Sequence, residues 1–209
     1  MPFNIPYAAI AQYSPKGISD IAVKSRALMY RVKNGDRKVI AGILEKYKAE
    51  VSMIENPYLL NDVTFVPVPR SSPIKKGDLW PGMVIAEELI KKSYGKDIKQ
   101  SINRIKSVPK SAFSEKGNRP TLAVHYNSLQ ASIEVTKPKK ILLIDDIITK
   151  GATTAACYMR LKEAFPDSKI AVFAFIRTKG NVPDIDTYIL PFQGKIIVDP
   201  KTDYTNRGD

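Results

Sequence analysis

The sequence predicts an α/β fold built around a parallel sheet. Two runs that are apolar on both faces, residues 141–144 (ILLI) and 170–176 (IAVFAFI), flank a helical stretch at about 153–165. Strands without alternating polar residues are typical of a parallel sheet covered by helices on both sides, and strand, helix, strand is the unit that builds such sheets. A third run, residues 63–68 (VTFVPV), is β-branched and is followed by helical periodicity from about residue 82, which indicates a second such unit.

The first 60 residues show helical periodicity. Apolar residues recur at three- and four-residue steps over about 21–32 and 39–47, and Asn34-Gly35-Asp36 separates these two runs. We therefore expect two helices in this part of the chain.

The remaining segments are shorter or more polar. A short strand is expected near 98–105, before a loop over about 106–120 that is rich in Lys, Ser, Pro and Gly. After Lys179, the apolar pieces TYIL and KIIV precede the polar end KTDYTNRGD, which we expect to fray. Without repeats or a low-complexity linker, we expect a single domain over 1–209, with its core at about 61–179.

Composition limits the class of protein. Hydrophobic residues make up 44% of the chain and charged residues 26%, which is ordinary for globular proteins, and no apolar run approaches the ~18 residues of a membrane helix. A single cysteine, Cys157, excludes an intramolecular disulfide, and one histidine, His125, leaves no Cys/His cluster for zinc. We expect a soluble cytoplasmic protein that does not bind a membrane.

The positive charge is unevenly distributed. The chain has 33 Lys and Arg against 21 Asp and Glu, a net charge of +12, and residues 91–120 alone hold nine basic and two acidic residues. This segment is either a solvated helix end and loop or a binding surface for phosphates, on a small ligand or on nucleic acid.

The segment Ile141-Leu-Leu-Ile-Asp145-Asp146-Ile-Ile-Thr149-Lys150-Gly151-Ala152-Thr153-Thr154 carries the chemistry that we expect. Its strand leads to the carboxyl edge of the sheet, where open α/β folds bind ligands. There Asp145 and Asp146 can accept hydrogen bonds from vicinal sugar hydroxyls and face a hydrated divalent cation. The loop 149–153 opens a helix, so its backbone N–H groups, threonine hydroxyls and helix dipole converge, and Gly151 leaves room for an anion. The segment predicts a site for ribose 5-phosphate.

The segment 141–154 also has other interpretations. The acids and threonines can serve simply as turn and helix cap. A Walker A loop places its lysine after the last glycine, whereas Lys150 precedes Gly151, and the Gly-x-Gly-x-x-Gly pattern of dinucleotide-binding folds is absent.

The segment ILLIDDIITKGATT resembles the motif by which type I phosphoribosyltransferases bind 5-phosphoribosyl 1-pyrophosphate (PRPP). ALMYRVKNGD, FVPVPRSS, and INRIKSVPKSAF together with residues 119–125 are similar to the ComF-like branch of that family, associated with DNA uptake, so the resemblance covers about 26–178. Many ComF-like proteins carry an N-terminal four-cysteine zinc ribbon, which this sequence does not have. The resemblance implies a type I phosphoribosyltransferase-like parallel sheet, with a small hood formed by about 1–60 and 180–209.

The resemblance also implies a role for particular residues, and magnesium as the cofactor. One of these residues, Arg70, can be interpreted instead as an exposed turn residue without a role in binding. The implied roles are ribose binding, catalysis and water-mediated Mg²⁺ contact for Asp145 and Asp146, 5-phosphate binding for Thr149, Lys150, Gly151, Ala152 and Thr153, pyrophosphate binding for Arg70 and Ser71, and closure of a flexible loop over PRPP for Lys106, Lys110 and Arg119.

Three further residues are interpreted as structural. Cys157 falls on an apolar helix face, Trp80 stands at a helix start, and His125 is expected to make a structural hydrogen bond rather than to act as a base.

The function expected first is a magnesium-dependent phosphoribosyltransferase that moves phosphoribosyl between pyrophosphate and a nitrogenous base, such as a nucleobase. The alternative is a ComF-like module that responds to PRPP or a nucleotide and assists DNA uptake, DNA processing or defence, with nucleic acid bound through 91–120. A third possibility is action within such an assembly through protein contacts. The family resemblance also implies a homodimer.

Overall fold

The fold was analysed in a computed structural model, which describes residues 1–48, 62–109, 120–132, 137–180 and 182–208. Most of the expected flexible loop, including Lys110 and Arg119, lies outside these described residues.

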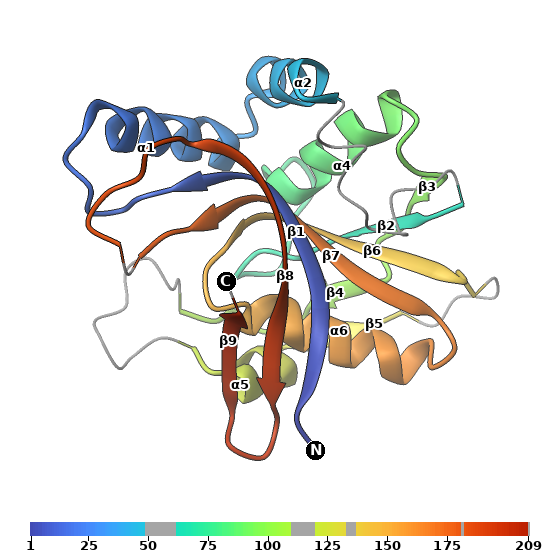
Figure 1. Ribbon diagram of the computed structural model, residues 1–209. Coiled ribbons are helices and arrows are strands. Elements are labelled where there is room, and N and C mark those ends of the chain that lie inside the picture. Colours follow the sequence, from blue (N-terminus) through green and yellow to red (C-terminus); the bar gives the residue numbers. More distant parts are fainter. Residues whose placement is uncertain (49–61, 110–119, 133–136, 181, 209) are drawn as a thin grey trace.

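A seven-stranded sheet forms the centre of the protein (Figure 1), in the order β3-β2-β6-β7-β1-β8-β9. The five strands from β3 to β1 are parallel, whereas β8 and β9 run antiparallel to their neighbours. The protein is therefore α/β with a mostly parallel sheet, an arrangement compatible with a Rossmann-like fold. The strands are β1 (Phe3–Tyr13), β2 (Thr64–Pro67), β3 (Asp97–Ile98), β6 (Lys140–Ile148), β7 (Lys169–Thr178), β8 (Ile189–Asp199) and β9 (Tyr204–Gly208).

Helices cover both faces of this sheet (Figure 1). Apolar side chains of α1 (Asp20–Lys33), α2 (Arg37–Lys46) and α4 (Pro81–Lys91) share one core with the sheet. On the opposite face, a second core includes α5 (Leu122–Asn127) and α6 (Ala152–Ala164). The short strands β4 (Ile102–Arg104) and β5 (Leu129–Ala131) pair with each other on either side of α5 along the chain.

Local sequence explains where several helices begin. The side chains of Ser19, Asp36 and Thr121 accept hydrogen bonds from the first-turn backbone N–H groups of α1, α2 and α5, which would otherwise have no partner in the helix. Pro81 opens α4, where its missing N–H costs nothing.

Most of the predicted elements are confirmed. The strand, helix, strand unit around the acidic motif is β6, α6 and β7; the run at 63–68 contains β2, and the two N-terminal helices are α1 and α2. The strand expected near 98–105 is divided, because β3 pairs with β2 while β4 pairs with β5.

The N-terminal strand β1 was not predicted. It lies between β7 and β8, so residues 3–13 belong to the sheet and not to a helical hood. Its inner part, Tyr7–Ala11, is buried without interruption and contains three alanines. Alanine has low β-propensity and the run has no alternation, so only the burial offered by neighbouring strands makes this segment a strand.

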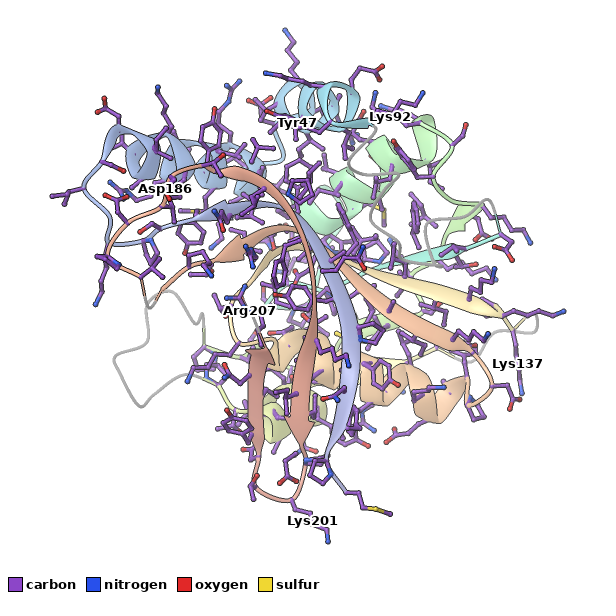
Figure 2. All side chains as sticks on the ribbon, in the orientation of Figure 1. Tyr47, Lys92, Lys137, Asp186, Lys201 and Arg207 are labelled. Carbon is purple, nitrogen blue, oxygen red and sulfur yellow. The ribbon has the colours of Figure 1, made fainter. Side chains whose placement is uncertain are left out.

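The expectation of a frayed C-terminus is wrong. Residues 204–208 form β9, which pairs with β8 over five residues, and Thr205 is buried. Arg207, labelled in Figure 2, donates a hydrogen bond to the Thr178 carbonyl at the end of β7. A polar strand is stable here because it adds to an existing sheet edge.

Replacing Ala9 with Asp tests the position of β1. Ala9 is fully buried, so an Asp side chain would be an unpaired buried charge that costs about 3 kcal/mol or more of the free energy of unfolding. Urea denaturation should show this loss for Ala9→Asp and little change for the control Asn4→Asp, which alters an exposed residue of the same strand. Equal effects would contradict the placement of β1.

Candidate functional site

The expected functional segments meet at the carboxyl edge of the parallel strands. The Val68 N–H donates to the Ile144 carbonyl at 2.8 Å, which holds the chain after β2 beside the end of β6. Strand β6 runs through Asp145 and Asp146 to Ile148, so the acids lie within the strand's last residues and not beyond it. Open α/β sheets bind ligands at this edge.

The loop between β6 and α6 has the backbone geometry of an anion site. Gly151 adopts φ +86° and precedes the first residue of α6, and no side chain in the described part of the chain caps this helix. A Cβ at this position would lie 2.8 Å from Cγ2 of Ile196 on β8, so glycine is required by the conformation and by the close packing. The first-turn N–H groups of α6 remain available for an anion.

A cavity of about 220 Å³ opens at this loop. Four parts of the chain line it: Asp145 together with residues 147–154, the start of α5 at 120–122, His125, and residues 203–205 at the start of β9. The cavity thus combines a carboxylate, the N-terminus of a 13-residue helix and several hydroxyls. Carboxylate oxygens can accept hydrogen bonds from sugar hydroxyls, and the backbone N–H groups at the start of a helix can donate hydrogen bonds to a phosphate.

Asp145 is a strongly perturbed carboxyl group. Its Oδ2 accepts a hydrogen bond from Thr154 Oγ1 at 3.1 Å, and its Oδ1 accepts from the Asp146 backbone N–H at 3.0 Å. Burial, followed by the neighbouring Asp146 carboxylate, raises the pKa of Asp145 well above its usual value. A bound cation or sugar hydroxyls would offset this unfavourable burial of charge.

Asp146 does not line the same cavity. Burial raises the pKa of Asp146, while the positive charge of Lys33 on α1 and a hydrogen bond with the Asp145 carboxyl group lower it. The carboxyl groups of the two acids therefore lie next to each other, although only Asp145 belongs to the cavity wall. The structure brings Asp145 together with residues 149–153 and leaves Asp146 beside α1.

Arg70 and Ser71 lie at the same sheet edge but outside the cavity wall. Arg70 Nη1 donates to the Leu79 carbonyl at 2.8 Å and lies 4.0 Å from Oδ2 of Asp78. The Arg70 carbonyl accepts from Nε of Arg104 at 2.9 Å. The Arg70 side chain is thus engaged with the turn before α4 instead of facing the loop 149–153.

The three residues expected in the flexible loop are only partly described. Lys106 is exposed and lies two residues before Val108, whose backbone N–H donates to the Ser71 carbonyl at 2.8 Å. The start of this segment therefore borders the Arg70 and Ser71 region. Lys110 and Arg119 are outside the described residues.

The sequence analysis missed part of the cavity wall. His125, interpreted as structural, lines the cavity with 4% of its surface exposed, and the wall is completed by residues 203–205 from the segment expected to fray. Asp203 Oδ1 accepts from the Ala123 N–H at 2.7 Å and so fixes the β8–β9 turn to α5. The capping residue Thr121 is the one local signal for α5, and nothing in the sequence indicates that β9 reaches it.

The described ranges contain no group of three or more His, Cys, Asp or Glu side chains that could hold a metal ion. In the same ranges, no helix is both long and apolar enough to cross a membrane. A comparison of the sequence with protein-family models and with curated proteins gives no match.

Replacing Gly151 with Ala should lower both stability and anion binding. The left-handed backbone costs a residue with a Cβ about 1–2 kcal/mol, and the contact with Ile196 adds to that cost. The matched control is Gly42→Ala in α2, where nothing lies within 4 Å of the added Cβ and about 0.5–1 kcal/mol of stabilisation is expected. Urea denaturation measures both variants, and a neutral Gly151→Ala would contradict this geometry.

Replacing Asp203 with Asn should strengthen binding of inorganic phosphate roughly severalfold, because it removes a like charge from the cavity wall. Asn tolerates the φ of +54° at this position and can still accept from the Ala123 N–H. Asp199→Asn, at the other end of the turn and outside the cavity wall, is the control. Calorimetry at two salt concentrations should show a gain that shrinks with salt, and an unchanged affinity would argue against phosphate in this cavity.

Proposed function

We propose that this protein is a type I phosphoribosyltransferase-like enzyme that binds PRPP with magnesium and transfers phosphoribosyl between pyrophosphate and a nitrogenous base. One observation carries the proposal: a single cavity joins the carboxylate of Asp145 to the left-handed Gly151 and the uncapped N-terminus of α6. A ribose 5-phosphate would present its hydroxyl groups to the Asp145 carboxylate and its phosphate to the N–H groups at the start of α6. The resemblance of ILLIDDIITKGATT to the PRPP motif points to the same ligand.

The acids fit a magnesium ion shared with the substrate. Burial already raises the pKa of both carboxyl groups, and a hydrated divalent cation beside them would lower the cost of keeping them ionised. When bound, the ion would neutralise charge on the departing pyrophosphate.

The residues of the chain would act mainly by positioning and electrostatics. In the transfer, the bond between ribose C1 and the pyrophosphate oxygen breaks, its electron pair leaves with pyrophosphate, a C1–N bond forms to the base, and the base releases its proton to solvent. Asp145 would orient the ribose, while the loop 149–153 would hold the 5-phosphate. Arg70 would have to leave the Leu79 carbonyl to reach the pyrophosphate. Lys106 would join it from the segment that Val108 holds to the Ser71 carbonyl.

Three of the nine basic residues of 91–120 are already engaged or buried, which gives limited support to this function over a nucleic-acid role for the segment. Within the described part of that segment, Lys91 forms an ion pair with Glu88 and Lys92 forms one with Glu45 (Lys92 is labelled in Figure 2). Arg104 is buried. These three basic residues are therefore poor candidates for contacting a polyanion.

Isothermal titration with PRPP, with and without magnesium, tests the proposal. Magnesium-dependent binding is expected for the native protein, with a loss of tenfold or more in Asp145→Asn and in Asp146→Asn. Asp167→Asn is the control, because it changes an exposed carboxylate in the turn before β7, at the opposite edge of the sheet. Pyrophosphate release in the presence of candidate bases would then measure transfer, and absence of PRPP binding by the native protein would refute the proposal.

Asp145→Asn should also make the fold more stable at neutral pH. The pKa of Asp145 is raised in the folded protein, so ionisation opposes folding above the unfolded-state pKa of about 3.9. Thermal denaturation should give a higher Tm for the variant at pH 7, and the difference should vanish below about pH 4, where the carboxyl is protonated in both states. A less stable variant at pH 7 would contradict the burial of this charge.

A further inference from the structure

The cavity contains the chain's only histidine in a position that calls for a ligand. His125 is 4% exposed and lies on α5, across from Thr153 in the first turn of α6. Thr153 Oγ1 is 3.2 Å from Nε2 and 3.4 Å from Nδ1 of the ring.

This contact does not satisfy the ring. Because Thr153 Oγ1 is almost equally far from the two ring nitrogens, it lies near the plane midway between them. The N–H and the lone pair of the imidazole instead point outward in the plane of the ring, one to each side. The angle to either nitrogen is then close to a right angle, at which hydrogen bonds are very weak. Among the described residues Thr153 is the only partner of the ring, so its in-plane donor and acceptor can bind a further group in the cavity.

The backbone around His125 is held firmly. Its carbonyl accepts from Ser128 Oγ at 2.6 Å and from Nη1 of Arg104 at 3.5 Å, and its N–H donates to the Thr121 carbonyl at 3.1 Å. Asp203 fixes the start of the same helix through Ala123. The backbone that carries the ring is therefore fixed at the cavity wall before any ligand arrives.

The charges around the ring keep it neutral. Burial and the Arg104 guanidinium lower the pKa of His125 to about 4, while Asp203 acts in the opposite sense. The other ionisable groups in the cavity wall are Asp145, Lys150 and Tyr204. At neutral pH the imidazole therefore offers one N–H donor and one lone pair.

We propose that His125 is a phosphate-binding residue: one ring nitrogen donates a hydrogen bond to the phosphoryl group of a phosphate monoester held by residues 149–153, and the negative charge of the bound phosphoryl group raises the pH at which the ring takes up its proton. The inference rests on the proposed function only for the place of the phosphoryl group. It requires neither PRPP nor transfer chemistry. By linkage, if anion binding favours the charged imidazole, protonation favours anion binding to the same degree.

Nuclear magnetic resonance of the single histidine tests this directly. The Cε1–H signal of the full chain needs no assignment, because the sequence has one histidine. It should titrate near pH 4 in the free protein, and with saturating ribose 5-phosphate the midpoint should rise by about one pH unit or more. Sulfate, whose charge is constant over this range, should also raise the midpoint and so separates titration of the ring from that of the phosphate.

Two variants separate a binding role from a structural one. His125→Phe keeps a planar ring without a donor and should weaken ribose 5-phosphate binding about tenfold, the size expected for a hydrogen bond to a charged group. His125→Gln keeps a donor, so it should retain part of the affinity but lose proton uptake, measured by calorimetry in buffers of different ionisation enthalpy. Urea denaturation confirms that each variant is folded.

The outcomes distinguish this inference from the proposed function. A histidine signal that does not respond while calorimetry shows ribose 5-phosphate binding would overturn the role of His125 and leave the proposed function standing. A response to ribose 5-phosphate without any PRPP binding would support His125 and refute the enzyme. Failure of both ribose 5-phosphate and inorganic phosphate to bind would overturn the inference as well.

Discussion

The pairing of β1 with two strands holds the candidate site together. On one side β1 continues the parallel sheet through β7, and on the other it carries the antiparallel hairpin of β8 and β9. That hairpin brings Ile196 against Gly151 and residues 203–205 to the cavity. The N-terminal strand β1 thus supports the C-terminal hairpin that completes the cavity wall, and loss of β1 pairing would remove that part of the wall.

Ionisable groups with unfavourable burial lie in the cavity wall and directly behind it. Burial raises the pKa of Asp145 and Asp146 and lowers that of His125 and of Arg104. Within the described residues Arg104 has one guanidinium nitrogen, Nη2, that is buried without a hydrogen-bond partner. Such perturbed groups concentrate at functional sites, because charges that destabilise the free protein can be compensated by a ligand.

His125 and Asp203, which both line the cavity, would act in opposite directions on a bound anion. Asp203 anchors α5 and disfavours an anion, whereas His125 can donate to one and become positive beside it. The balance between these two residues, with Arg104 behind them, would set the affinity for a phosphoryl group. Residues 203–205, from a polar segment without a recognisable motif, would thereby contribute to ligand binding.

The sequence by itself determined the α/β class, the unit formed by β6, α6 and β7, and the adjacency of Asp145 to the loop 149–153, because these depend on hydrophobic period and on neighbours along the chain. Only the tertiary structure decided that alanine-rich β1 is a strand, that the polar C-terminus pairs with β8, that Asp145 but not Asp146 lines the cavity, and that His125 lies against Thr153. Each of these depends on burial or pairing between segments far apart in the chain, where local propensity is weak and long-range packing sets the conformation.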